Sequence, residues 1–227
     1  MAGTKYDVLK KKQTELIRKA LDGSAFIASA DAPPLVALTD PTDSLLKALP
    51  ATGTPQMPWG DLGWLSADGA QFSRDVSTSD ITSWGSVSPT RSDVTADSST
   101  LTVACQETNI RTIGLSTGMD MSSITPTAGS GEVQIQKPSR PSSRFYRVLS
   151  LAVDQGDAGE IYIGRYMPRA KVTGFSEQAF GGGDDPIMWG VTFTGYEDSD
   201  EGFSESWIFG GPGWKALLVD MGFTAVV

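Results

Sequence analysis

Residues 71–107 read QFSRDVSTSDITSWGSVSPTRSDVTADSSTLTVACQE, and this stretch decides the class of the fold. It is rich in Ser, Thr, Asp and β-branched residues, which favour strands and turns over helix interiors. At its end, Leu101, Val103 and Cys105 alternate with polar side chains. Alternation with a period of two is typical of a strand with one buried and one wet face. The stretch therefore predicts a mainly β domain.

Further strands are expected downstream of this stretch. Residues 133–136 and 187–194 alternate in the same way and predict two more strands with one buried face. Residues 144–153 are apolar on both faces for much of their length, which indicates a central strand. Residues 160–166 follow the turn-forming residues 154–157, so we expect these last two strands to pair as a hairpin.

Helices are expected at two places. Residues 7–21 put apolar side chains, Val8 and Leu16 among them, on one face, which predicts an amphipathic helix. Residues 107–115 break the strand pattern and carry two isoleucines three positions apart, with Thr108 available as a cap. They predict a short helix packed on the edge of the sheet.

The expected organisation has three parts. Residues 24–58 carry six prolines and read as an extended arm, so residues 1–58 are expected to form an N-terminal helix and arm. Residues 59–209 are expected to form a β-sandwich or half-barrel with long hairpins. Residues 210–227 are expected to form a C-terminal arm that ends in a strand at 217–219.

Composition limits the chemistry. The 227 residues carry a formal net charge of −9, contain no histidine, and contain one cysteine, Cys105. The absence of histidine excludes Ser-His-Asp and Cys-His catalysis and histidine-ligated zinc. Cys105 occupies an apolar position of its strand, so we expect a buried hydrophobic side chain there. We therefore expect no enzyme, no cofactor and no metal site.

Partners and compartment are also limited by the sequence. An acidic surface repels phosphate backbones, which disfavours tight direct binding of nucleic acid. The N-terminus lacks the apolar segment of a secretory signal, and no apolar run is long enough to span a bilayer. We therefore expect a protein that folds in a cytoplasm and does not bind a membrane.

Three patterns leave alternatives open. The adjacent carboxylates Asp184 and Asp185 suit Ca²⁺, but they lack the spaced oxygen ligands of a calcium loop, and a turn before the next strand is favoured. Two aspartates within residues 75–97 would suit a glycosidase if they lay at working distance, although aspartate is common at turns. The six tryptophans would suit a monomeric carbohydrate-binding β-sandwich.

Residues 59–214 carry a long, ordered set of matches to one family. Besides residues 71–107, they include ETNIRTIGLSTG (107–118), PRAKVTGFSEQAF (168–180), DDPIMWGVTFTGY (184–196) and IFGGPGW (208–214). Through these stretches the chain resembles the major tail protein, or tail tube protein, of actinobacterial phages with long non-contractile tails. Ordered matches over this length are more specific than a single short motif.

The resemblance implies a structural subunit of the virion tail. Proteins of this family form hexameric rings that stack into a hollow tube, through which DNA leaves the capsid without specific binding. The implied partners are other copies of the chain and the tape-measure, tail-terminator and distal tail proteins, and assembly is implied in the host cytoplasm. A tail-terminator or connector protein, which forms single rings, is the related alternative.

Two sets of residues are candidates for function in such a tube. We expect residues 72–95 to form a long hairpin or loop that contacts another ring or neighbour, and the C-terminal arm to do the same. The candidate interface residues are Phe72, Trp84 and Trp214. An acidic lumen would repel DNA phosphates and let the genome slide. The candidate lumen-facing acids flank expected strands and are Asp75, Asp80, Glu132 and Glu160.

Overall fold

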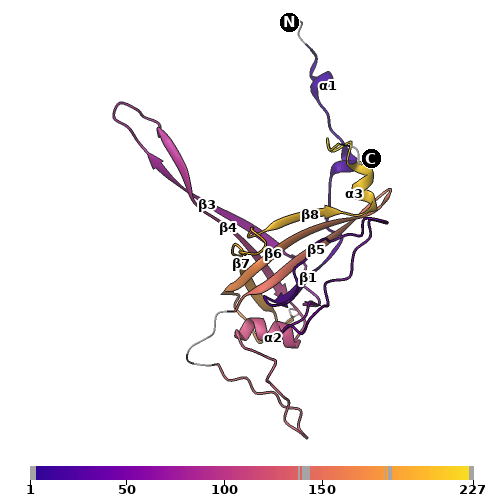
Figure 1. Cartoon of the computed structure of the whole chain (residues 1–227), viewed down its shortest axis with the longest axis vertical. Coiled ribbons are helices and arrows are strands. Elements are labelled where there is room, and N and C mark those ends of the chain that lie inside the picture. The colour runs from indigo at the N-terminus through magenta and orange to yellow at the C-terminus, as the bar shows by residue number, and fades with distance from the viewer. Residues whose placement is uncertain (1–3, 138, 140–143, 182, 184–185, 225–227) are drawn as a thin grey trace.

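The computed structural model describes residues 4–137, 139, 144–181, 183 and 186–224. In this part of the chain, antiparallel strands form one eight-stranded sheet in the order β2-β1-β5-β6-β7-β4-β3, and β8 pairs with β6 beside that path (Figure 1). The strands are β1 (Asp22–Ser29), β2 (Gly60–Asp61), β3 (Gln71–Ile81), β4 (Arg91–Cys105), β5 (Tyr146–Gly156), β6 (Gly159–Phe175), β7 (Trp189–Gly195) and β8 (Ser206–Gly210). The helices are α1 (Tyr6–Leu9), α2 (Ile110–Thr117), α3 (Pro212–Leu217) and a 3-10 turn, Thr14–Leu16.

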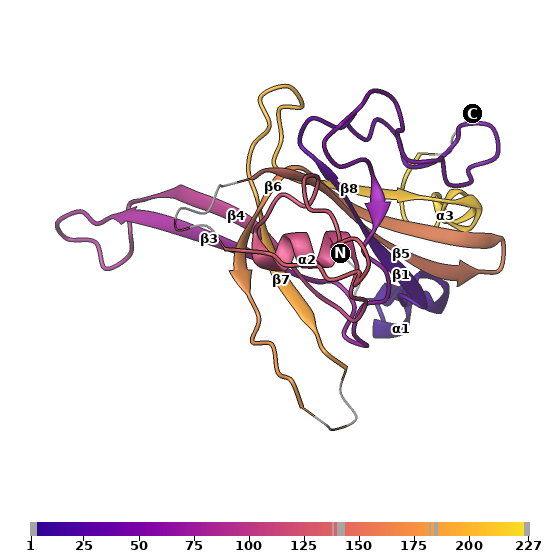
Figure 2. The same cartoon turned by 90° about the horizontal axis from the view of Figure 1, so that it is seen from below.

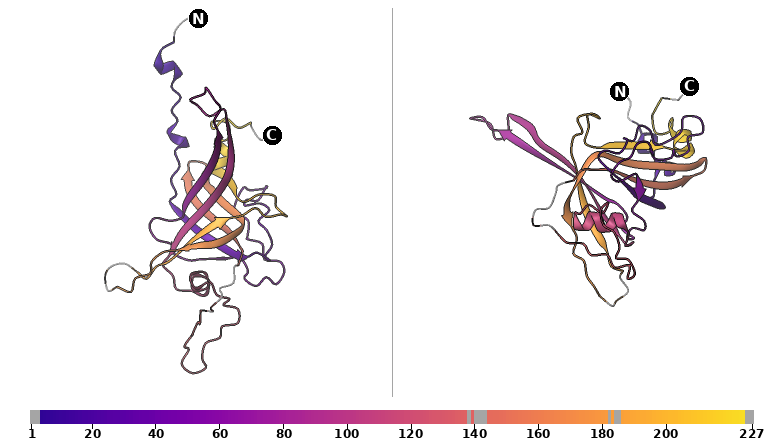
Figure 3. Two further views of the ribbon diagram at one scale, coloured as in Figure 1. Left: turned by 90° about the vertical axis from the view of Figure 1, so that its left-hand side faces the viewer. Right: turned by 60° about the horizontal axis from the view of Figure 1, so that its bottom comes forward.

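The long strand β6 joins two halves of the sheet. Its first half pairs with β5 on one side and β8 on the other, and its second half pairs with β7. Pro168 lies between the halves, where Met167 still pairs with Val148 but Ala170 pairs with Tyr146. Proline donates no backbone N–H, so it is tolerated at such a register shift. Figure 3 shows that the sheet as a whole is strongly curved, and this eight-stranded antiparallel sheet confirms the predicted half-barrel type of fold.

The core consists of two apolar clusters, one on each face of β5. Val148 belongs to the cluster between the two halves of the sheet, together with Leu101, Val103 and Phe193. The next residue, Leu149, belongs to the second cluster, on the other face. The prediction of a central strand apolar on both faces is therefore confirmed, as is its pairing with β6 as a hairpin.

The predicted short helix is confirmed as α2, and it lies across the lower opening between the two halves of the sheet (Figure 2). Its cap is Asn109 rather than Thr108. The Asn109 side chain accepts hydrogen bonds from the N–H groups of Arg111 and Thr112. The Thr108 hydroxyl instead accepts the indole N–H of Trp189, which ties the start of the helix to β7.

The hairpin of β3 and β4 is long and mostly free of the body. Its base packs on the core through Leu101, whereas both strands are exposed from Ser73 to Ile81 and from Arg91 to Asp97. Figure 1 shows the hairpin projecting well away from the rest of the molecule. The expectation of a long hairpin in residues 72–95 is therefore confirmed, and the contact it makes stays a prediction.

The predicted amphipathic helix at residues 7–21 is wrong. Helical structure there is limited to α1 and the 3-10 turn, and the backbone is extended at the flanking residues Lys10, Gln13 and Ile17. Val8 and Leu9 are 70 % and 65 % exposed, so the apolar face packs against nothing in the part of the chain that the structure describes. A short helix without such packing is marginal in water, and the hydrogen bond from the Leu21 N–H to the Val153 oxygen draws the chain into the sheet instead.

The predicted arm of residues 24–58 is also wrong. Residues 22–29 form β1, which pairs with β5 along its whole length, so they belong to the same sheet as the segment after residue 58. The proline-rich segment that follows lies on the body, because Leu35 and Leu38 are buried in the second cluster. The prolines indicated irregular backbone correctly for the segment from Pro33 onward, but the short apolar strand that precedes them was missed.

Two other predicted strands are absent from the described chain. Leu217 ends α3, which starts at Pro212, a residue suited to the first turn of a helix, and residues 218–219 follow in a turn. Residues 131–137 form an exposed loop, and Val133 has no neighbouring strand to pair with. Two apolar residues in alternation are too few to define a strand without such a partner.

Candidate assembly surfaces

The tip of the β3–β4 hairpin presents two uncovered apolar side chains. Trp84 and Val87 have exposed fractions of 106 % and 103 %, as large as in an extended chain. The tip is nevertheless ordered: the hydroxyls of Ser83 and Thr90 are 2.8 Å apart, and the Thr90 N–H donates to the Ile81 oxygen. A closed loop that leaves a whole indole in water is typical of an anchor for another molecule.

The other two candidate interface residues are partly covered by their own chain. Phe72 is half-buried at the base of β3, and the guanidinium of Arg165 lies over its ring. Trp214 lies in α3 and stacks on Phe209 with ring centroids 4.8 Å apart. The structure therefore does not bring the three residues together, and Trp84 alone among them has a fully uncovered side chain.

The face of β4, β6 and β7 that points away from the core is lined by hydroxyls. The Thr102 and Thr192 hydroxyls are 2.9 Å apart, and those of Thr173 and Thr194 are 2.7 Å apart. Thr100 pairs in register with Thr194, so it extends the same surface. These five threonines are half-buried or exposed, and we call them the threonine face.

The four candidate lumen acids lie in different places. Asp75 pairs with Ser98 and shares the side of the sheet that carries the threonine face. Asp80 is five residues further along β3, which puts its side chain on the opposite side, because successive side chains alternate. Glu132 is in the exposed loop after α2, and Glu160 starts β6 at the far end of the β5–β6 hairpin. The four acids therefore do not form one surface.

Glu160 has a partner of its own. Its carboxylate accepts a hydrogen bond from the Tyr162 hydroxyl at 2.5 Å. Burial, followed by this hydrogen bond, raises the pKa of Tyr162 to about 12. The acid therefore helps to hold the end of the β5–β6 hairpin, whatever else it contacts.

One edge of the sheet is long and unprotected. β3 stands last in the strand order and has 11 residues, so its outer edge carries backbone donors and acceptors that no strand of the described chain meets. The edge strand at the other end, β2, has only two residues. A long free edge is a template for pairing with a strand of another copy.

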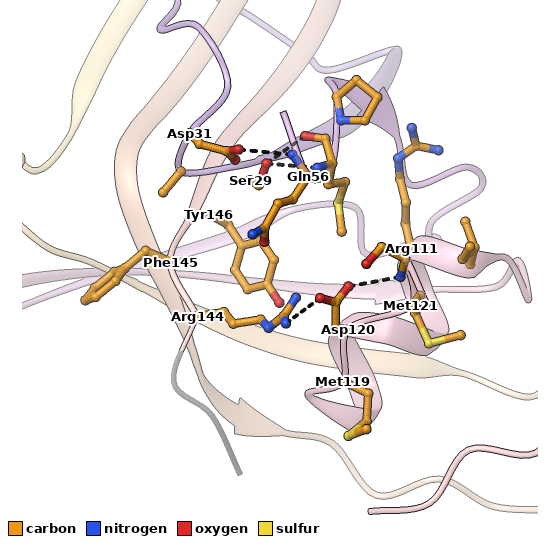
Figure 4. Close-up of a pocket in the computed structure, with 15 residues that line it drawn as sticks. Ser29, Asp31, Gln56, Arg111, Met119, Asp120, Met121, Arg144, Phe145 and Tyr146 are labelled. Atoms are coloured by element: carbon orange, nitrogen blue, oxygen red, sulfur yellow. Dashed lines mark hydrogen bonds and ion pairs between the residues drawn. The ribbon is translucent and has the colours of Figure 1, made fainter. Parts of the chain in front are cut away.

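A cavity of about 400 Å³ lies where the end of β1, the start of α2 and the start of β5 meet (Figure 4). We call it the α2 pocket. Its apolar lining includes Met57, Ile110, Met119, Met121 and Tyr146. No sequence pattern predicted it, since its walls come from segments that are far apart in the chain.

The α2 pocket is lined by two acids and two arginines, of which Arg144 and Asp120 form an ion pair. Arg144 donates to Asp120 at 2.8 Å, and this hydrogen bond holds the pKa of the Asp120 carboxyl well below its usual range. The Asp31 carboxylate accepts the backbone N–H of Gln56 at 3.0 Å. The Nε of Arg111 is buried without a hydrogen-bond partner among the described residues. The pocket therefore offers an apolar wall, a few polar groups and no large net charge.

Features of a catalytic or metal site are not evident in the described part of the chain. Cys105 is buried, as predicted, and burial raises the pKa of its thiol to about 12, which removes it as a nucleophile. The described residues hold no group of three or more Cys, Asp or Glu placed to bind a metal ion. Asp184 and Asp185, considered above for Ca²⁺, lie outside the described residues. No helix that the structure describes is long and apolar enough to cross a membrane.

Comparison with known proteins identifies the family. No curated protein matches the chain significantly. Among solved structures, a chain of the virion of a native gene transfer agent particle is similar with a TM-score of 0.34 and 12 % identity, covering 66 % of this chain and 88 % of that one. A family model described as phage tail tube protein matches residues 11–211, most of the sequence. The chain therefore belongs to the phage tail tube protein family.

Proposed function

We propose that copies of this chain form hexameric rings that stack into the tube of a long non-contractile tail of an actinobacterial phage, and that this tube conducts the genome into the host. The observation that carries the proposal is the β3–β4 hairpin, which has a free edge and an uncovered Trp84 at its tip. Neither feature stabilises an isolated monomer. Both suit contacts between copies, which close around a ring and continue along an axis.

The threonine face is the surface that we assign to the lumen. Its paired hydroxyls form a polar wall, which suits a water-filled pore. Asp75 extends that wall on the β3 side. The formal net charge of −9 agrees with a conduit that repels phosphates, so that DNA passes without specific binding.

The remaining parts of the proposal follow from membership of the family. Other copies of the chain are the main partners, and tape-measure, tail-terminator and distal tail proteins would meet the tube along its bore and at its ends. The protein would be found in the virion tail after assembly in the host cytoplasm.

Negative-stain electron microscopy of the purified, untagged protein at rising concentration tests the proposal. Hollow tubes with a regular axial repeat are expected, and rings with six subunits should be visible in end views. Isolated rings that never stack would favour a tail-terminator or connector. A protein that stays monomeric even when seeded with tail fragments would contradict the proposal, and binding to a glycan array would then be measured.

A further inference from the structure

We propose that the α2 pocket of one copy receives Trp84 from the hairpin tip of the next copy. This inference rests on the proposed function, and it names the pocket that would bind the exposed Trp84 side chain in the assembled tube. Among the described residues none covers the Trp84 side chain, and none fills the largely apolar α2 pocket. The two features are complementary in size and chemistry.

The pocket suits an indole. A volume of about 400 Å³ is enough for a large aromatic side chain. Three methionines in its wall, Met57, Met119 and Met121, adapt readily to the shape of a flat ring. A buried indole N–H also needs an acceptor, and the carboxylates of Asp31 and Asp120 line the same pocket.

Charge favours the hairpin tip over the other projecting segment, the N-terminal residues 5–19. The tip, residues 82–90, contains no charged residue, which matches a pocket whose two acids and two arginines balance in formal charge. Residues 5–19 contain six basic and two acidic residues, so they suit an acidic surface instead. A backbone oxygen of the neutral tip would also supply an acceptor for Nε of Arg111.

The hairpin tip and the α2 pocket lie far apart on one copy, so the same contact can be repeated from each copy to the next. β4 has 15 residues, from Arg91 beside the tip to Cys105, and the chain then runs directly into α2 at the pocket. At about 3.3 Å per residue, the strand separates tip and pocket by about 50 Å. In Figure 1 the hairpin tip and α2 lie at opposite ends of β4, and the α2 pocket lies at the start of that helix. A contact of this kind is head-to-tail, so it either closes into a ring of copies or continues along the tube axis, according to the rotation between neighbours.

Filling the pocket tests the proposal. Ala30 is exposed and lines the α2 pocket, whereas Ala67 is exposed and lines a second cavity, of about 410 Å³, beside Phe72. Ala30→Trp should abolish tubes at a concentration where wild type and Ala67→Trp both form them, and it should leave the urea midpoint of the monomer unchanged. Normal tubes from Ala30→Trp would overturn the proposal. Loss of tubes from Ala67→Trp alone would place Trp84 in the second cavity.

Cysteine cross-linking gives a second, direct measurement. Ser86 lies two residues from Trp84, and Ser122 lines the α2 pocket. Under oxidation, tubes of the double variant Ser86→Cys/Ser122→Cys should give a ladder of covalent oligomers, and a mixture of the two single variants should give dimers only. The control pair, Ser86→Cys with Asp68→Cys from the second cavity, should give no ladder.

The outcomes separate this inference from the proposed function. If wild type forms no tubes, the proposed function fails and the inference fails with it. If tubes form normally but Ser86→Cys and Ser122→Cys do not cross-link, only the inference fails. Dimers from Ser86→Cys alone would show a tip-to-tip contact and would also overturn it. If deletion of residues 1–19, rather than Trp84→Ala, removes the tubes, the N-terminal segment is the occupant.

Discussion

The guanidinium carbon of Arg165 lies 3.9 Å from the centroid of the Phe72 ring, which joins the middle of β6 to the base of the projecting hairpin. Trp207 lies on the same guanidinium at 5.3 Å, and the carboxylate of Glu205 forms an ion pair with it. The hairpin therefore starts from a fixed base. A rigid start is what allows a long, exposed hairpin to present its tip in a defined direction.

Phe72 is consequently expected to act on stability. Its ring packs against the first core cluster as well as under Arg165. Phe72→Ala should lower the free energy of unfolding by about 2 kcal/mol, since it removes a half-buried ring and a cation–π contact. Val76→Ala, at an exposed position on the same side of β3, is the control and should change it by less than about 0.5 kcal/mol. Equal urea midpoints for the two variants would contradict this role.

The two remaining interface candidates, Trp84 and Trp214, should differ in whether they affect assembly or the stability of the monomer. Trp84→Ala is expected to leave the urea midpoint of the monomer unchanged and to abolish tubes, because the side chain is uncovered in the monomer. Trp214→Ala should instead lower the free energy of unfolding by about 2 kcal/mol, since it breaks the stack on Phe209. Unfolding of the chain by Trp84→Ala would show that Trp84 is a core residue.

Sequence predicted the fold best where a pattern was long. Residues 101–105 and 146–156 carry enough apolar residues in the right order to define β4 and β5. β1 was missed because its apolar run is short and is followed by prolines. Its pairing with β5 joins segments that are far apart in sequence, so no local pattern predicts it. The helix expected at residues 7–21 failed for the converse reason: the apolar pattern was present, but no surface of the described residues buries it.

The candidate site was predictable only in part. The hairpin and Trp84 are continuous in sequence, so composition and pattern were enough to find them. The α2 pocket joins Ala30, Ile110 and Tyr146, which no local pattern connects. The facing of Asp75 and Asp80 also depends on strand register, which fixes the direction of each side chain only once β3 is placed in the sheet.

Asp75 and Asp80 lie on opposite sides of β3, so the two residues provide a test and a matched control for the lumen hypothesis. Asp75 shares the side of the threonine face, whereas Asp80 points to the other side of the same strand. Asp75→Lys should leave tubes intact and slow DNA ejection, because it puts a cation where phosphates pass. Asp80→Lys is the matched control and should leave ejection unchanged. Time-resolved DNA release from particles carrying each variant measures this, and equal ejection rates would contradict the assignment of the lumen wall.

Among the polar residues, Arg147 is expected to contribute most to the free energy of unfolding of the β-sheet body. It is buried, and its guanidinium donates to the Ala32 oxygen at 2.8 Å and to the Tyr166 hydroxyl at 3.1 Å. Arg147→Ala should lower the free energy of unfolding by about 3 kcal/mol, because it leaves buried acceptors without donors. Arg91→Ala removes an exposed ion pair with Asp93 and should cost less than about 1 kcal/mol. Chemical denaturation of both variants provides the comparison, and a cost for Arg147→Ala no larger than that for Arg91→Ala would contradict the role of this guanidinium.

The pair of Asp120 and Arg144 at the α2 pocket gives a prediction with a pH dependence. The hydrogen bond from Arg144 keeps the pKa of Asp120 below its unfolded value, so the pair contributes stability above about pH 4 and loses it as the pH falls further. Asp120→Asn keeps an acceptor for the Ser122 N–H but removes the charge. Because the Asp120 side chain is 36 % exposed and water screens the pair, the variant should be less stable by only about 1 kcal/mol at pH 7.

The difference between wild type and Asp120→Asn should stay constant from pH 7 to about pH 5 and shrink toward pH 3, because the wild-type carboxyl then begins to take up a proton in the unfolded chain. Urea unfolding at pH 7, 5 and 3 measures it, with Asp68→Asn as a control at an exposed position. A difference that grows as the pH falls would mean that the pKa of Asp120 is raised rather than lowered. In that case the carboxylate would not hold Arg144 in place, and the wall of the α2 pocket would need another support.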